Sequence, residues 1–198
     1  MHSIQVAWFK TMLSNTDLIA RLKKITLIVT DIDGSLTDGT VLYDNNGEAD
    51  RLYSPQDGYV IRMALENDIQ VAFLSGNAGA SIISRAKKLG IDPDLTILGS
   101  KDKRVSVATL RSRADATSEQ TLVFGDDYLD AAVKEADPTV VFAMPNNGVF
   151  YLKHTADCVV PVNAGRDGAL RLLLDLVLYV QGKHIAQRFI DQALTHSK

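Results

Sequence analysis

Residues 25–39, ITLIVTDIDGSLTDG, decide the fold of this chain. Residues 25–30 are apolar or β-branched, which predicts a strand buried on both faces. Asp31 and Asp33 follow at once, and Gly34 allows a sharp backbone turn. We therefore expect both carboxylates at the carboxyl end of a strand, where open α/β folds bind their ligands. Because an unpaired buried carboxylate is costly, a cation or a basic side chain is expected beside them.

The composition indicates one ordinary globular domain. The chain has 198 residues, of which 46% are hydrophobic and 23% charged, and its net charge of −3 gives no electrostatic reason to bind nucleic acid. Cys158 is the single cysteine, so no intrachain disulfide can form, which fits a reducing cytoplasm. The sequence contains no apolar run of about 18 residues, so a membrane span is not expected.

Three parts are predicted along the chain. Residues 1–24 form an N-terminal arm or partly ordered tail followed by a short packing helix, which Asn15 or Thr16 caps. Residues 25–182 form the main domain, and residues 183–198 form an amphipathic C-terminal tail. Within the main domain, the turn dipeptide Asn46-Gly47 joins two β-like runs and predicts a projecting β-hairpin over residues 40–54.

Strand and helix patterns alternate about six times with short connections. This alternation predicts a doubly wound, Rossmann-like parallel α/β sheet with helices on both faces. The expected strands cover residues 25–30, 69–74, 95–98, 121–124, 140–143 and 158–160.

Polar groups follow four of these strands, and parallel strands all end at the same edge of a sheet. Each group alone is a weak signal, but their convergence in chain order indicates one site. Lys103 is the expected lysine of this set, and Lys101 is the alternative. The groups are Asp31 with Asp33; Ser75 with Gly76 and Asn77; Lys103; and Asp126 with Asp127 and Asp130.

Phosphoryl transfer is the chemistry that requires such a set. Mg²⁺ binds oxygen ligands and takes one or two carboxylates, which Asp31 and Asp126 can supply, with Asp33 included in the metal set. Asp31 is the expected nucleophile, forming an aspartyl-phosphate. Asp33 is the expected acid and base for the leaving alkoxide and the attacking water.

The remaining groups are assigned to the phosphate and to support. Ser75, with the backbone amides of Gly76 and Asn77 nearby, and the Lys103 ammonium are expected to hold the equatorial phosphoryl oxygens. Asp127 and Asp130 are expected behind them, orienting metal waters or Lys103.

This set resembles the haloacid dehalogenase superfamily, whose four motifs occur here in order as DIDGSLTDG, LSGN, the lysine of SKDKR, and GDDYLD. The following stretch, DGTVLYDNNGEADRLYSPQDGYVIRMA, is similar to the capless branch of 3-deoxy-D-manno-octulosonate 8-phosphate phosphatases and sialic-acid-type 9-phosphate phosphatases. The resemblance covers roughly residues 24–183 and implies a fold without a separate cap domain.

The resemblance also implies a homotetramer built through the hairpins of residues 40–54. A neighbour's glycine-arginine segment then helps to close the site, which makes Arg166 of AGRDGALR a candidate for binding the substrate in trans. Three positions depart from the family pattern: Asn77 and Gln56 stand where arginines are common, and Asp167 separates Arg166 from the next glycine. Each lost arginine removes a bidentate anion clamp, so the core chemistry is retained while the sugar is in question.

We therefore expect a cytoplasmic Mg²⁺-dependent phosphomonoesterase acting on a small phosphorylated sugar acid. The resemblance favours 3-deoxy-D-manno-octulosonate 8-phosphate. One alternative is another phosphosugar, such as a sialic-acid-type 9-phosphate. An alternative of a different class is a non-catalytic tetrameric scaffold or binding module that has kept the fold.

Overall fold

The main sheet has six strands, all parallel, in the order β5-β4-β1-β6-β7-β8. The structure is a computed structural model that describes residues 2–45, 47 and 49–196. The parallel strands in this order confirm the predicted doubly wound sheet. The strands are β1 (Leu27–Thr30), β4 (Gln70–Leu74), β5 (Thr96–Ile97), β6 (Thr121–Phe124), β7 (Val141–Met144) and β8 (Cys158–Val159).

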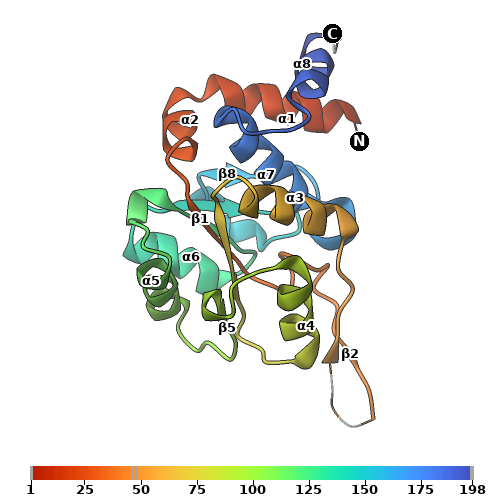
Figure 1. Ribbon diagram of the computed structural model, residues 1–198, viewed down its shortest axis with the longest axis vertical. Helices are drawn as coiled ribbons and strands as arrows, with labels where there is room; N and C mark the ends of the chain where they lie inside the picture. Colours follow the sequence, from red (N-terminus) through yellow and green to blue (C-terminus); the bar gives the residue numbers. More distant parts are fainter. Residues whose placement is uncertain (1, 46, 48, 197–198) are drawn as a thin grey trace.

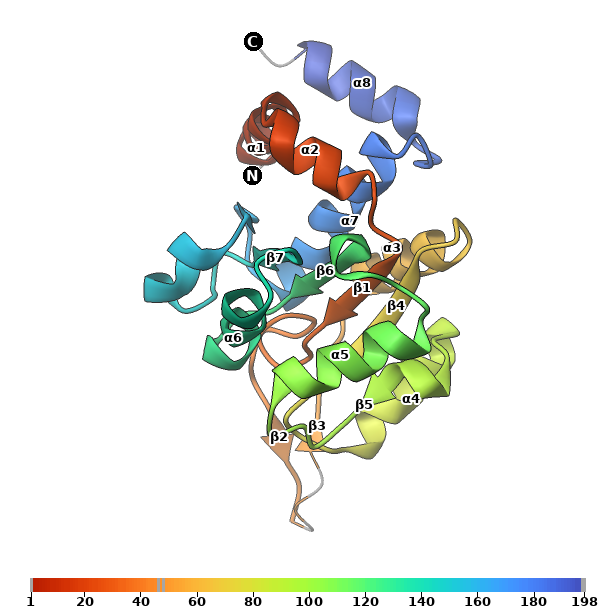
Figure 2. The same ribbon diagram turned by 90° about the vertical axis from the view of Figure 1, so that its left-hand side faces the viewer.

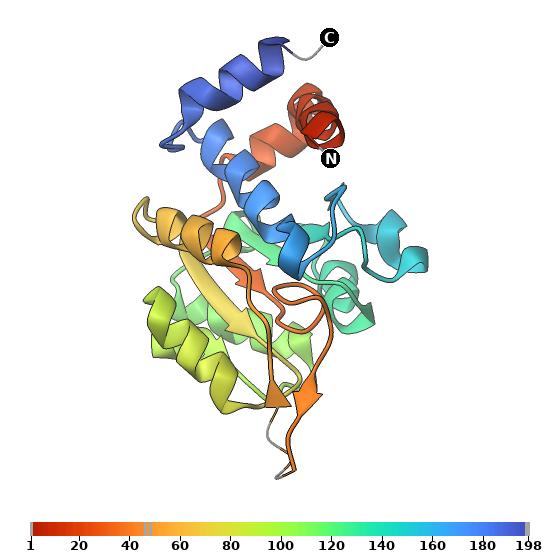
Figure 3. The ribbon, with the colours of Figure 1, turned by 90° about the vertical axis from the view of Figure 1, so that its right-hand side faces the viewer.

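The core lies where the sheet is covered on both sides. Every residue of β1, β6 and β7 is buried, as expected for strands that pack helices on two faces. On one face α5 (Lys103–Arg113) packs against α6 (Tyr128–Ala136), and on the other α3 (Pro55–Leu65) packs against α7 (Ala169–Val180) (Figures 2 and 3). The helix that connects β4 to β5 along the chain is α4 (Ala80–Leu89).

The hairpin between β1 and α3 projects from the carboxyl end of the sheet (Figure 1). Its strands are β2 (Leu42–Tyr43) and β3 (Ala49–Asp50), which pair antiparallel. The predicted Asn46-Gly47 turn lies partly outside the described residues, because Asn46 is not among them. The described residues between β1 and α3 form only this hairpin and its flanking loops.

A helical layer covers the opposite end of the molecule, where both chain ends lie (Figure 1). Residues expected as an arm or tail form α1 (His2–Ser14), which buries Val6, Trp8 and Phe9. The next helix, α2 (Thr16–Leu22), begins after Asn15, whose side chain accepts a hydrogen bond from the Leu18 amide at 3.1 Å, as predicted for a helix cap.

The C-terminal tail forms α8 (Gln187–His196), which packs against α1 of the same chain. The Tyr179 hydroxyl donates to Asp191 at 2.8 Å, and the Phe9 and Tyr179 rings meet edge to face with centroids 5.4 Å apart. None of the described helices has the length and apolar character needed to cross a bilayer. Short 3₁₀ segments complete the chain: η1 (Pro93–Leu95), η2 (Ser118–Gln120), η3 (Phe150–Thr155) and η4 (Gly165–Asp167).

Candidate active site

The candidate site lies at the point where the strand order reverses. After β1 the chain continues to β4 and β5 on one side, while β6, β7 and β8 extend the sheet on the other. Asp31 follows β1 and Asp126 follows β6, so the two carboxylates leave neighbouring strands at this switch point. Open α/β sheets bind their ligands in the crevice at such points.

Gly34 brings the first loop against the Asp126 carboxylate. Its φ of +94° is left-handed, and a Cβ added there would lie 2.2 Å from Asp126 Oδ2. Only glycine therefore fits this turn, for reasons of both conformation and space. The Ser35 hydroxyl in the same loop donates to Asp126 Oδ1 at 3.0 Å, a contact that no sequence pattern predicts.

Of the two candidate lysines, Lys103 contacts the carboxylates, and it is almost completely buried at the first residue of α5. Its ammonium donates to Asp31 Oδ1 at 2.6 Å and to Asp130 Oδ1 at 2.7 Å. Burial lowers the pKa of Lys103, but the charges of Asp130 and Asp31 outweigh it, so the pKa is raised and the side chain stays charged. Lys101, the alternative, is exposed in the preceding loop.

Three carboxylates meet beside this ammonium. Oxygen atoms of Asp31, Asp126 and Asp130 all lie within 4.8 Å of one another. Burial, followed by repulsion from Asp130, raises the pKa of Asp31 to about 8 and that of Asp126 to about 6. A crowded set of partly desolvated carboxylate oxygens is the donor set that a hard divalent cation neutralises, so the residues present fit Mg²⁺.

Asp130 and Asp127 have different environments, although the sequence assigned them the same supporting role. Asp130 is buried against Gly125, where an added Cβ would lie 2.1 Å from the Asp130 Cγ. Asp127 is exposed and caps α6, since its Oδ1 accepts from the Tyr128 amide at 2.6 Å. The structure therefore brings Asp130 into the carboxylate group and leaves Asp127 outside it.

Asp33 does not turn its carboxylate to the other three acids. Arg51 donates from Nε to Asp33 Oδ1 at 2.6 Å and from Nη2 to Oδ2 at 3.0 Å, and Asn77 Nδ2 donates to Oδ2 at 2.9 Å. Burial acts to raise the pKa of Asp33, but the hydrogen bonds from Arg51 and Asn77 hold it below its ordinary value. The carboxylate of Asp33 is thus separate from the group of oxygens that fits a metal ion.

Arg51 was missed by the sequence analysis, because it lies within a β-like run where a charged residue normally faces solvent. Its side chain is only 1% exposed. A single basic residue between Asp50 and Leu52 gave no sign that the hairpin would bring it back to the end of β1.

The serine loop follows β4, the strand beside β1. Ser75 is buried, and its hydroxyl accepts a hydrogen bond from the Asn77 amide at 3.0 Å. The Ser75 and Ser100 backbones also pair, with Ser100 N donating to Ser75 O at 3.0 Å, while a Cβ on Gly76 would meet Ser100 O at 3.5 Å. These contacts place the loops of the serine and the lysine side by side at the edge that carries Asp31.

Arg166 lines a separate pocket of about 770 Å³. Asp38, in the loop that follows β1, lines the same pocket. Gln56 and Asp167, two of the three positions that depart from the family pattern, also line this pocket, whereas Asn77 does not. Gly165 holds the Arg166 segment close to the first loop, because a Cβ there would lie 2.6 Å from Asp38 N.

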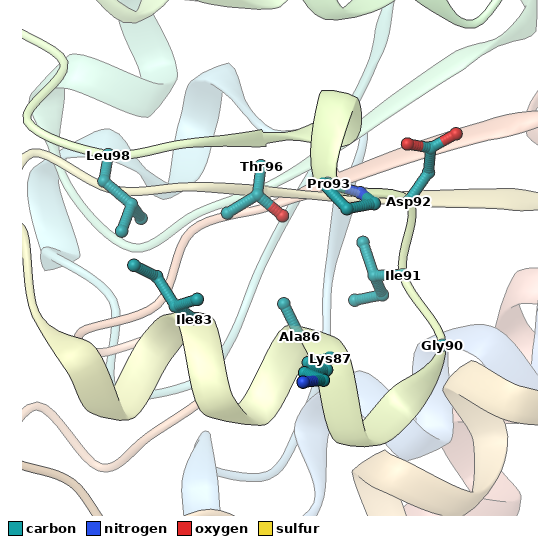
Figure 4. A pocket seen from close by; sticks show the side chains of 9 residues that line it. All are labelled: Ile83, Ala86, Lys87, Gly90, Ile91, Asp92, Pro93, Thr96 and Leu98. Carbon is teal, nitrogen blue, oxygen red and sulfur yellow. The ribbon is translucent and has the colours of Figure 1, made fainter.

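Another pocket, of about 860 Å³, lies between α4 and β5 and is shown in Figure 4. Ile83, Ile91 and Leu98 give it apolar walls, with Lys87 and Asp92 also on its lining. Its lining contains none of the candidate site residues.

No protein-family model matches the chain, but curated proteins and solved structures do. The chain is 39% identical over 163 residues to 3-deoxy-D-manno-octulosonate 8-phosphate phosphatase KdsC of Haemophilus influenzae, covering 82% of this chain and 88% of that protein. The enzyme of the same name from Escherichia coli strain K12 is 33% identical over 169 residues, covering 85% and 87%.

Solved structures of phosphatases of this kind, and of a related hydrolase, have a similar fold. The cobalt-bound form of the Haemophilus influenzae phosphatase has a TM-score of 0.76 at 36% identity, covering 82% of this chain and 92% of that one. The Moraxella catarrhalis phosphatase in complex with magnesium, phosphate and KDO has a TM-score of 0.79 at 26% identity, covering 90% and 98%. A Legionella pneumophila hydrolase of the haloacid dehalogenase (HAD) superfamily, subfamily III A, has a TM-score of 0.80 at 27% identity, covering 94% and 98%.

Proposed function

Because this chain belongs to the 3-deoxy-D-manno-octulosonate 8-phosphate phosphatase family of the HAD superfamily, we propose that it is a metal-dependent phosphatase acting on that phosphorylated sugar acid. The observation that carries the proposal is the Lys103 ammonium between Asp31 and Asp130, with Asp126 within reach of the same point. A binding module needs no buried nucleophile beside a metal-ligand set, so this geometry favours an enzyme over a scaffold.

In the proposed reaction, an Asp31 oxygen forms a bond to phosphorus while the bond from phosphorus to the sugar oxygen breaks. Asp33 gives a proton to the leaving alkoxide, and an aspartyl-phosphate remains on Asp31. Water then attacks phosphorus, Asp33 takes its proton, and the bond from Asp31 to phosphorus breaks to release inorganic phosphate. When Mg²⁺ is bound by Asp31 and Asp126, it supplies Lewis-acid stabilisation of the phosphoryl oxygens.

Lys103, Ser75 and the backbone amides of Gly76 and Asn77 are proposed to hold the phosphoryl group. The ammonium is fixed by its two carboxylates, so it is in place before charge develops on the phosphoryl oxygens. The hydrogen bond that Asp130 accepts from the Lys103 ammonium is proposed to keep the ammonium in place. Asp127 is assigned only a structural role, because it is exposed and caps α6.

The experiment that tests the activity compares wild-type protein with Asp31→Asn on a panel of phosphate esters with Mg²⁺ present. The wild type is expected to release phosphate fastest from 3-deoxy-D-manno-octulosonate 8-phosphate, and Asp31→Asn is expected to release none. Asp127→Asn is the matched control and should retain turnover. Undiminished turnover by Asp31→Asn would refute the mechanism, and faster release from a sialic-acid-type 9-phosphate or a neutral sugar phosphate would refute the substrate.

The panel also bears on the two missing arginines. Asn77 is bound to Asp33, and Gln56 faces the pocket of Arg166, so neither supplies the guanidinium that the family commonly has. Arg166, on the same pocket, is proposed to bind the substrate carboxylate or phosphate, from its own or a neighbouring subunit. Arg166→Gln should raise KM for an acidic sugar phosphate more than for a neutral one.

We also propose a cytoplasmic homotetramer assembled through the hairpins. The exposed fractions of Leu42, Tyr43 and Leu52 are 57%, 70% and 75%, an apolar surface that a partner would cover. Cys158 is buried and burial raises its pKa to about 12, which suits an unreactive thiol in a reducing compartment. Leu52→Asp should lower the mass measured by light scattering, and an unchanged tetramer in a Leu42→Asp/Leu52→Asp variant would contradict assembly through this surface.

A further inference from the structure

Arg51 is a buried arginine at the base of the hairpin, directly after β3. Its guanidinium meets Asp33 with two parallel hydrogen bonds, one to each carboxylate oxygen, at 2.6 and 3.0 Å. A bidentate pair of this kind fixes the plane of the carboxylate as well as its position. Because the Arg51 side chain is only 1% exposed, water competes little for these bonds.

The guanidinium is itself held from the other side, by the start of α4. Its Nη1 donates to the Ser81 hydroxyl at 3.4 Å, and a Cβ on Gly79 would lie 3.2 Å from the same nitrogen. Asn77 adds a third donor to Asp33 at 2.9 Å. All three hydrogen bonds to Asp33 therefore come from outside its own loop, from the hairpin and from the segment after β4.

We propose that Arg51 is a positioning residue, which orients Asp33 for proton transfer and makes that orientation depend on where the hairpin lies. The inference rests on the proposed function, since it concerns the acid and base of that reaction. A proton-transfer group must lie within hydrogen-bond reach of the leaving oxygen, and a displacement of about 1 Å can reduce the rate on the order of 100-fold.

The hairpin carries the apolar surface proposed for assembly, while its base carries the arginine that holds Asp33. A shift of β3 relative to the sheet would move the guanidinium, and Asp33 would follow. Subunit assembly and catalysis are thus linked through one side chain.

A double-mutant cycle tests the catalytic part. Arg51→Gln should lower kcat about 10- to 100-fold with KM nearly unchanged, and Arg51→Lys, which restores one donor, should recover part of the loss. Asp33→Asn should lower kcat further, and the double variant should be no slower than Asp33→Asn alone. Multiplicative losses in the double variant would show that Arg51 does not act through Asp33 and would overturn the proposal.

Arg21→Gln is the matched control. Arg21, in the last turn of α2, makes a similar two-bond pair with Asp157, at 2.7 and 3.3 Å, away from the candidate site. Its loss should lower the unfolding midpoint without changing kcat. A comparable fall of kcat in Arg21→Gln would mean that general destabilisation explains the effect of Arg51→Gln.

Amide hydrogen exchange tests the link to the hairpin without any activity. Asp33→Ala removes the two carboxylate oxygens that accept hydrogen bonds from Arg51. Exchange at residues 49–53 should therefore become faster than in the wild type, whereas Arg21→Gln should leave it unchanged. Unchanged exchange in Asp33→Ala would overturn the link. Wild-type protein that hydrolyses no phosphate ester would refute the proposed function, and the exchange result would still be read separately.

Discussion

Replacing Lys103 by methionine should destabilise the fold in a pH-dependent way. The change removes the ammonium that bonds Asp31 at 2.6 Å and Asp130 at 2.7 Å, where these two side chains are 8% and 3% exposed. Breaking a buried pair by removing one partner costs about 3–5 kcal/mol. With a urea dependence of about 2 kcal/mol per molar, the midpoint should fall by about 2 M at pH 8 without divalent cations.

The loss should be smaller at pH 5. Burial raises the pKa of Asp130, and burial together with repulsion from Asp130 raises the pKa of Asp31. The Lys103 ammonium lowers both pKa values, so its removal raises them further. A carboxyl group with a raised pKa in the folded state contributes stability at low pH that disappears as the pH rises through that pKa. The variant can therefore bind protons at pH 5 and avoid unpaired buried charge.

Urea unfolding of the cation-free protein measures this effect. Trp8, the single tryptophan, is buried and donates to Val159 O at 2.8 Å, so its fluorescence reports loss of packing far from the substitution, and circular dichroism provides a second signal. Lys101→Met, on an exposed neighbour, is the control and should change stability by less than about 0.5 kcal/mol. An unchanged midpoint for Lys103→Met at pH 8, or a larger loss at pH 5, would refute the reasoning.

Three further predictions concern glycine, buried charge and metal. Gly34→Ala should weaken Mg²⁺ activation through displacement of Asp126, whereas Gly47→Ala, with φ of +80° and open space around its Cβ, should carry backbone strain alone; equal activation constants would contradict this. Asp57 is fully buried, which raises its pKa to about 7, so the wild type should lose stability between about pH 4 and 7, and Asp57→Asn should flatten that part of the urea-midpoint profile; a parallel profile would count against it. A chelator should stop phosphate release and Mg²⁺ should restore it, and turnover that persists in excess chelator would exclude the metal requirement.

The sheet could be predicted from the sequence because its strands are short apolar runs that end in polar residues. Such runs pack on both faces whatever lies nearby, and parallel strands place their ends together. Because Asp31, Lys103 and Asp126 each follow a strand of this parallel sheet, we could predict from the sequence that they lie close together. The family resemblance and the metal-dependent phosphatase class are confirmed by the relatives.

Contacts made by returning loops could not be predicted in this way. Arg51 reaches Asp33 only because the hairpin exit folds back to β1, and no local pattern encodes that path. The adjacent acids Asp126 and Asp127 look alike in sequence, yet one faces the site and the other caps a helix. The N-terminal segment showed no helical period because α1 has neighbours on more than one side, including α2 and α8.

The placement of both chain ends bears on how this protein can be handled. They lie beside the helical layer, at the end of the molecule opposite the hairpin (Figure 1). A tether or fused reporter attached there would leave both the candidate active site and the hairpin surface open to solvent. Immobilised protein should therefore still release phosphate from its substrate, provided that α1, with its buried tryptophan, is kept whole.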